Sequence, residues 1–141
     1  MKSLLALSLA LISVPVWACT GLQITEGWIR QAPPGAHVMA AYANLTNHSG
    51  KPLSITAIKS PAFGAIEIHQ TRIEDGESRM MALDDITIAA HDQTRLAPGG
   101  IHLMLFRPRA PQLEAGDKTT LTFHCRKQKP IKAVFHVRAA E

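Results

Sequence analysis

The chain has 141 residues, of which 46% are hydrophobic and 18% are charged, and its formal net charge is +4. This composition is that of an ordinary folded protein, and the length suits one domain with one hydrophobic core. The basic residues are spread along the sequence without a run of like charges. This argues against nucleic-acid binding, because a nucleic-acid-binding surface concentrates lysine and arginine in a stripe.

The first 18 residues have the pattern of an export signal. Lys2 supplies a positive start, residues 4–14 form an apolar run too short to span a membrane, and Val-Trp-Ala at 16–18 resembles a small-x-small cleavage site. A buried N-terminal helix is the alternative, but Pro15 opposes a continuous helix. We therefore expect residues 1–18 to be a signal peptide and residues 19–141 to form a single exported domain in the periplasm.

Two cysteines follow this signal, Cys19 and Cys125. In an oxidising compartment an even number of cysteines favours a disulfide, which here would join the start of the mature chain to a late strand. The competing interpretation is lipidation of Cys19 after a lipobox-like cleavage, which would anchor the chain to a membrane and leave Cys125 unpaired. Bulky Trp17 close to the cut opposes lipidation, so the disulfide is the expectation and lipidation the alternative.

Eight segments show the alternation or the β-branched residues that are typical of strands. They are residues 22–30, 38–47, 53–59, 65–72, 78–83, 102–107, 119–124 and 131–138. Turn-forming Pro, Gly, Asn and Asp residues lie between them, and no window of a dozen residues shows helical periodicity. Many short strands separated by turns predict an all-β protein, either a sandwich or a barrel.

The dipeptide Asp75-Gly76 predicts a two-residue hairpin loop, which fixes the pairing of the flanking strands. In this register Thr71 lies opposite Met80. His69 and Met80 then become diagonal neighbours on one face of the hairpin, about 7–8 Å apart at the backbone. A slip of one residue would place the two side chains on opposite faces.

A second pair of candidate donors lies on a later strand. Because side chains alternate along a strand, His102 and Met104 share a face with Phe106, opposite the aliphatic face of residues 101–105. The site should therefore lie outside the core, where a partner can reach it, whereas Met81 should face the core. The other histidines should be surface or sheet residues, namely His48, His91, His124 and His136. His37 and Met39 are candidates for a peripheral or secondary site.

The residues His69, Met80, His102 and Met104 offer two imidazoles and two thioethers, an uncharged and soft donor set that selects Cu(I). Thioether sulfur cannot form a disulfide, and it binds more weakly than thiolate, so the ion can leave. Zn²⁺ would require thiolate or carboxylate ligands, and a blue-copper site would require a Cys beside two His. With no catalytic constellation apparent, the sequence predicts binding and release of one Cu(I) per chain, and no enzyme.

At these residues the sequence resembles the periplasmic copper chaperone family PCuAC, whose motif is H-(M)-x10-M-x21-H-x-M. The four candidate donors match this spacing without insertion, although the optional Met after the first His is replaced by Gln70. The resemblance covers nearly the whole chain after residue 18. It includes Gly-Trp-Ile-Arg at 27–30 and the block Pro-Gly-Gly-Ile-His-Leu-Met-Leu at 98–105.

The resemblance implies a cupredoxin-like or Greek-key β-sandwich that binds Cu(I) through the two His and two Met. It also implies delivery of copper to a respiratory oxidase, chiefly to the apo dinuclear site of cytochrome c oxidase subunit II, with Sco-type thiol proteins as further partners. Two alternatives stay open. The same site could sequester copper for resistance, or the chain could be a metal-free β-sandwich interaction module.

Overall fold

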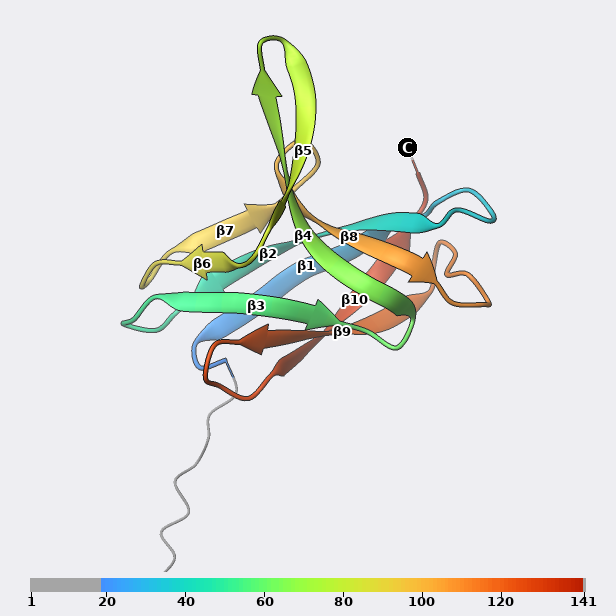
Figure 1. The fold of residues 1–141 in the computed structure, drawn as a ribbon. Coiled ribbons are helices and arrows are strands. Elements are labelled where there is room, and N and C mark those ends of the chain that lie inside the picture. The colour runs from blue at the N-terminus through green and yellow to red at the C-terminus, as the bar shows by residue number, and fades with distance from the viewer. Residues whose placement is uncertain (1–18, 141) are drawn as a thin grey trace, which may run out of the picture.

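The computed structural model describes residues 19–140, so the predicted signal peptide lies outside the described residues. Within this range the regular structure is all β (Figure 1). The ten strands are β1 (Leu22–Arg30), β2 (Val38–Asn47), β3 (Leu53–Lys59), β4 (Phe63–Glu74), β5 (Glu77–Leu83), β6 (Ile86–Ile88), β7 (Gln93–Leu96), β8 (Ile101–Pro108), β9 (Lys118–Cys125) and β10 (Ile131–Arg138). None of residues 19–140 belongs to a helix long and apolar enough to cross a membrane.

The predicted strands all occur. β1, β2, β3 and β10 have the predicted bounds, and β4, β5, β8 and β9 extend beyond them at one or both ends. The strands β6 and β7 are missing from the prediction, because their three and four residues are too few to show an alternation.

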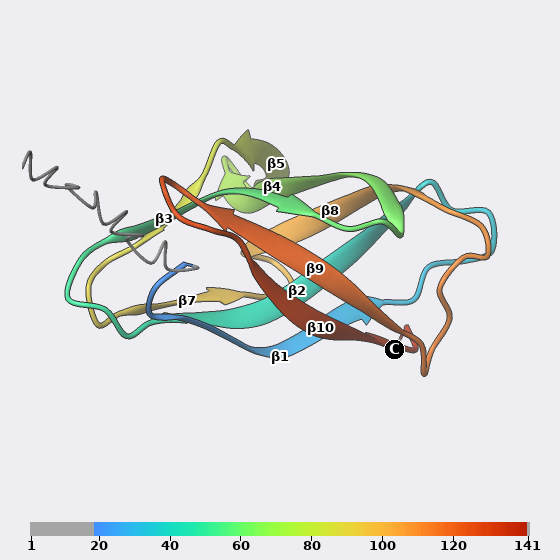
Figure 2. The same ribbon diagram turned by 90° about the horizontal axis from the view of Figure 1, so that it is seen from below.

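Hydrogen bonds join the strands into one sheet in the order β5-β4-β8-β2-β1-β10-β9-β3-β6, and β7 is attached to β2. The first half of β2 pairs with β8 and its second half with β7. The sheet curls over, so that β3 and β4 lie across the core from β1 and β2 (Figure 2). The predicted single-domain β-sandwich is therefore confirmed.

The core comes from the inward positions of the alternating strands. Ile29 of β1, Leu103 and Leu105 of β8, and Phe123 and Phe135 are fully buried, and the two phenylalanine rings stack with centroids 6.1 Å apart. Full burial of such a side chain contributes about 1.5–3 kcal/mol. The inward face of β8 is thus anchored in the core, which fixes the strand whose other face carries two of the candidate donors.

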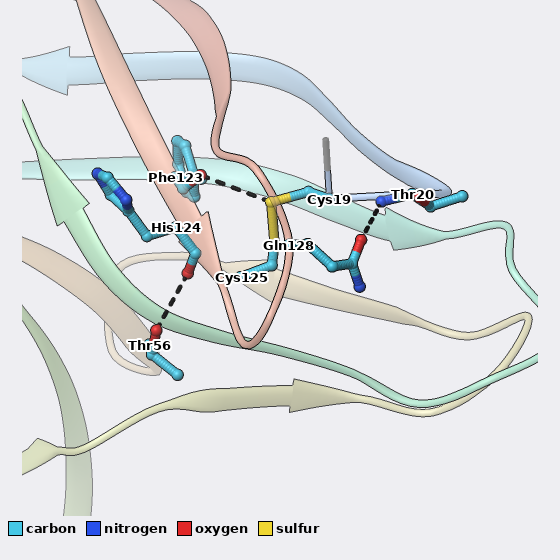
Figure 3. Close-up of a disulfide and its surroundings, with 7 residues drawn as sticks. All are labelled: Cys19, Thr20, Thr56, Phe123, His124, Cys125 and Gln128. Atoms are coloured by element: carbon cyan, nitrogen blue, oxygen red, sulfur yellow. Dashed lines mark hydrogen bonds between the residues drawn. A yellow bond between two sulfur atoms is a disulfide. The ribbon is translucent and has the colours of Figure 1, made fainter. Parts of the chain in front are cut away.

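A disulfide joins Cys19 to Cys125 at the end of β9 (Figure 3). The two Cα atoms are 5.5 Å apart, and the bond closes a sequence separation of 106 residues. Next to it, the backbone N–H of Thr20 donates to the side-chain carbonyl of Gln128, and the N–H of Cys19 donates to the carbonyl of Lys129. The structure thus contains the expected disulfide.

Candidate metal centre

The β4–β5 hairpin has the predicted register. Asp75 and Gly76 have φ angles of 52° and 78°, as the two central residues of a type I′ turn require. Thr71 lies opposite Met80, and His69 precedes Thr71 by two residues. His69 and Met80 are therefore diagonal neighbours on one face of the hairpin, as the turn signal predicts.

The two candidate histidines lie directly opposite each other on adjacent strands. His69 of β4 pairs with His102 of β8, their ring centroids are 6.1 Å apart, and the ring planes are inclined by 56°. Met104, two residues after His102, lies on the same face opposite Glu67. The sheet thus gathers two imidazoles and one thioether from two strands on a single face.

His102 is only 5% exposed, and the turn before β8 orients its ring. Its Nδ1 lies 3.0 Å from the carbonyl oxygen of Gly100, which also accepts a hydrogen bond from the backbone N–H of Thr71 at 3.1 Å. Because a carbonyl oxygen can only accept, Nδ1 carries the proton and Nε2 keeps its lone pair. The Pro-Gly-Gly turn therefore leaves His102 Nε2 as the ring nitrogen that is available to a ligand.

His69 is oriented by a carboxylate that the sequence analysis did not single out. Its Nε2 lies 2.9 Å from Oε2 of Glu67, two residues earlier on the same face of β4. An ionised carboxylate only accepts, so Nε2 carries the proton, and in the neutral ring Nδ1 has the lone pair. The spacing of two residues along a strand was the available signal, because such residues share a face.

The Nδ1 atom of His69 is buried and has no hydrogen-bond partner, the one side-chain nitrogen or oxygen of residues 19–140 in that condition. Buried polar atoms are nearly always paired, so an unpaired one calls for an explanation. A lone pair held without a protein partner, beside a second imidazole with a free nitrogen, is the arrangement that a metal ion would complete.

The two methionines differ in exposure. Met104 is half-buried on β8, between its partners on β2 and β4. Met80 is 61% exposed on β5, the edge strand of a hairpin that stands out from the body of the molecule (Figure 1). The structure therefore brings His69, His102 and Met104 together on β4 and β8, and Met80 approaches the same face from the hairpin.

The prediction that Met81 faces the core is wrong, since this side chain is 43% exposed. β5 pairs with β4 alone and stands out from the body (Figure 1), so only its last residue, Leu83, packs against the core. Met39 is buried in the core and cannot form a peripheral site with His37, which is exposed. The remaining histidines are exposed or half-buried, as expected: His48, His91, His124 and His136.

The donor set is soft. Within residues 19–140, no group of three or more His, Cys, Asp or Glu side chains could hold a metal ion. Both cysteines are consumed by the disulfide. The candidate donors that remain on this sheet face are imidazoles and thioethers, a combination that suits Cu(I) better than Zn²⁺ or Cu²⁺.

Fold and candidate site together describe a β-sandwich with two His and two Met side chains on an outer sheet face. Residues 22–137 match the family model described as "Putative lipoprotein LpqE-like". Because this match spans most of the chain, the protein belongs to the LpqE-like family.

Two curated relatives match over shorter stretches. The chain is 32% identical over 103 residues to the "Putative lipoprotein Lxx21020" of Leifsonia xyli subsp. xyli, which covers 72% of this chain and 60% of the relative. It is 35% identical over 85 residues to the "Uncharacterized protein RP573" of Rickettsia prowazekii, which covers 60% of this chain and 46% of the relative. The chain thus spans only about half the length of the curated relatives it matches.

Several solved structures share the fold. The copper-bound PCuAC domain from PmoF2 superposes with a TM-score of 0.73 at 20% identity, covering 88% of this chain and 97% of that domain. The CuI form of DR1885 from Deinococcus radiodurans gives a TM-score of 0.66 at 24% identity, covering 84% of this chain and 80% of that protein. At these identities the likeness shows the fold, and it confirms the predicted fold class.

Proposed function

We propose that this protein is an exported metallochaperone that binds one Cu(I) ion through His69, Met80, His102 and Met104. It releases the ion to an apo copper site of a respiratory oxidase, such as the dinuclear centre of cytochrome c oxidase subunit II. Two proteins that share the fold are described as copper-bound and CuI forms, which supports copper as the cargo. The role is binding and transfer, without catalysis.

The single observation that carries this proposal is the buried, unpaired Nδ1 of His69 opposite His102. Each ring has one nitrogen engaged by an acceptor, Glu67 for His69 and Gly100 for His102, so each is left with one free lone pair. Hydrogen bonds of this kind fix the tautomer and the orientation of metal-binding histidines in general.

The chemistry of the donors suits transfer more than storage. Neutral imidazole and thioether ligands add no charge to stabilise a divalent ion, and thioether is a weaker ligand than thiolate. In an oxidising compartment thiolates are lost to disulfides, as Cys19 and Cys125 illustrate, whereas thioethers stay available. Cu(I) can therefore be held and then surrendered to a site with stronger ligands.

Export to the periplasm is supported by the signal-like residues 1–18 and by the disulfide, since disulfides persist in oxidising compartments. Exposure of Met80 at 61% gives an incoming acceptor ligand access to one metal–sulfur bond, which favours stepwise exchange. Sco-type thiol proteins are further candidate partners in the same transfer.

The proposal is tested by competitive Cu(I) titration against a chromophoric chelator, comparing the wild type with Met80→Ala and Met81→Ala. Both methionines are exposed on β5, but they point to opposite faces of the strand, so Met81→Ala is a matched control. We expect one Cu(I) per chain, weaker binding in Met80→Ala and wild-type binding in Met81→Ala. Equal effects of the two substitutions would remove Met80 from the site.

Delivery requires a second measurement. Cu(I)-loaded protein is mixed with an apo copper domain of cytochrome c oxidase subunit II, and the metal content of both proteins is followed. Transfer supports the chaperone role. Tight Cu(I) binding without transfer would instead indicate sequestration, and absence of stoichiometric Cu(I) binding would leave the protein a metal-free interaction module.

A further inference from the structure

Two exposed arginines stack on two aromatic rings where the ends of β1 and β10 lie beside β2. The rings of Trp28 and Tyr42 have centroids 4.6 Å apart. The Arg30 guanidinium carbon lies 5.9 Å from the Trp28 ring and 5.7 Å from the Tyr42 ring, and that of Arg138 lies 5.1 Å from Trp28. These cation–π contacts hold both guanidinium groups in place. We call these four residues the arginine–aromatic cluster.

A β-bulge in β1 turns Trp28 and Arg30 to the outer face of the sheet, where they cover the ring of Tyr42, which is 5% exposed. Thr25 pairs with Asn44, but Trp28 pairs with Tyr42, so β1 has one extra residue between the two pairs. The extra residue reverses which side chains point inward, because side chains alternate along a strand. After the bulge Ile29 is fully buried, and Trp28 and Arg30 face outward.

The cluster shares a sheet face with the copper donors. Arg30 of β1 pairs with Ala40 of β2, and Ala40 pairs with Met104 of β8. Directly opposed side chains lie on the same face, and adjacent strands are about 4.8 Å apart, so the Arg30 backbone lies roughly 10 Å from that of Met104. The small Ala40 is the only residue between them in this row. A molecule docked on the cluster would therefore also reach the donor face.

The guanidinium groups of the cluster have N–H groups that no carboxylate of residues 19–140 engages in an ion pair. Among residues 19–140, the arginines in ion pairs are Arg79 and Arg126, and neither Arg30 nor Arg138 has a carboxylate within ion-pair distance. A hollow of about 130 Å³ is lined by Trp28, Arg30, Arg138 and Ala139.

An adjoining hollow of about 300 Å³ combines Arg95 and Arg138 with a single acid, Glu26. That acid is engaged within the protein, since its carboxylate accepts a hydrogen bond from the amide of Asn44. With one carboxylate against two guanidinium groups, the lining of this hollow carries a net positive charge.

We propose that the arginine–aromatic cluster is the docking surface for the copper-accepting protein, and that this acceptor presents Asp and Glu side chains beside its copper site. The inference rests on the proposed chaperone function. Arginine binds carboxylates through two parallel hydrogen bonds, and Trp, Tyr and Arg carry most of the binding energy in many interfaces. The stacking fixes both guanidinium groups before a partner arrives, which lowers the entropy lost on binding.

The test measures the rate of Cu(I) transfer to a soluble apo copper domain of cytochrome c oxidase subunit II at low and high ionic strength. The copper-donating proteins are the wild type, the variant Arg30→Gln/Arg138→Gln and the control Lys51→Gln/Lys129→Gln. The control removes the same charge from exposed residues in the β2–β3 loop and the β9–β10 turn. A second acceptor has the Asp and Glu around its copper loops changed to Asn and Gln. Cu(I) affinity is measured for every donor.

We expect the arginine variant to bind Cu(I) like the wild type but to transfer it at least about tenfold more slowly at low ionic strength, with little dependence on salt. The lysine control should transfer within about twofold of the wild type, whose rate should fall as salt is added. The neutralised acceptor should slow the wild type to the rate of the arginine variant. These results together support the docking surface.

Wild-type transfer rates in the arginine variant would overturn the docking proposal and leave the proposed function standing. Absence of Cu(I) binding by the wild type, or Cu(I) binding without transfer to this acceptor, would instead count against the proposed function and would overturn the docking surface with it. A further arm measures binding to phosphatidylglycerol vesicles. If the arginine variant lost vesicle binding but kept its transfer rate, the cluster would be a membrane surface and the docking proposal would be wrong.

Discussion

The strands β8 and β5 both contribute candidate donors to one sheet face, yet the fold holds them very differently. β8 lies between β4 and β2, and its inward residues Leu103 and Leu105 are fully buried, so His102 is fixed and 5% exposed. β5 has β4 as its one partner, and Met80 is 61% exposed. The candidate site therefore has a fixed part on β8, which sets the geometry, and an exposed part on β5, where a ligand can be exchanged.

The fixed part depends on the stability of the body, to which the Cys19–Cys125 disulfide contributes. Replacing both Cys19 and Cys125 with Ser should lower the free energy of unfolding by about 4–5 kcal/mol, as expected for a closed loop of about a hundred residues. Denaturant unfolding measures this loss. At temperatures where the variant is folded, its Cu(I) affinity should equal that of the wild type. A large loss of affinity in the folded variant would contradict the separation of body and site.

The substitution His102→Ala tests the fixed part directly. Removing a buried donor whose ring is already oriented by Gly100 should lower Cu(I) affinity by at least about a hundredfold, or about 2.7 kcal/mol. The control is His124→Ala, because His124 is half-buried on β9, away from the donor face. Competitive titration with unchanged affinity in His102→Ala would show that the fixed part binds no metal.

The role of Glu67 can be separated from that of the donors. Glu67→Leu removes the acceptor for Nε2 of His69 and should weaken Cu(I) binding by about 10- to 100-fold, the usual effect of losing a hydrogen-bond partner of a metal-binding histidine. Glu67→Gln keeps a carbonyl acceptor and should restore most of the affinity. The ¹⁵N chemical shifts of the His69 ring should report a proton on Nε2 in the wild type and in Glu67→Gln, and a tautomer mixture in Glu67→Leu. Identical tautomers in all three proteins would rule out this positioning role.

The smallest effect should come from the exposed part. Met80→Leu should lower Cu(I) affinity by less than about tenfold, whereas Met104→Leu should lower it more, since Met104 is half-buried on β8, between β2 and β4, while Met80 is 61% exposed on an edge strand. The off-rate of Cu(I), measured by chelator chase, should show the same order. If Met80→Leu weakened binding more than Met104→Leu, the assignment of the hairpin as the exchangeable part would be reversed.

Much of the fold could be predicted because its signals are local. Alternation gave four strands their observed bounds, and Asp75-Gly76 fixed the hairpin register and with it the diagonal placement of Met80 and His69. The short strands β6 and β7 could not be predicted, since they are set by pairing with β3 and β2 and not by their own residues. The β1 bulge was also hidden, because it depends on how β1 pairs with β2.

In the candidate site, too, local features could be predicted and features that depend on strand pairing could not. The spacing of the four donors was visible in the sequence, and alternation placed His102 and Met104 on one face. The direct pairing of His69 with His102 was not predictable, because it depends on a contact between distant strands. Met81 was misplaced since the alternation rule assumes a core beneath the strand, and the β5 hairpin extends beyond that core.

X-ray absorption at the copper edge of the Cu(I)-loaded protein tests the central claim most directly, because it counts the scatterers around the ion. The structure leads us to expect a shell of two nitrogen and two sulfur atoms, with one sulfur lost in Met104→Leu and none lost in Met81→Leu. A shell of nitrogen and oxygen alone, or one that is unchanged in Met104→Leu, would contradict the proposed site.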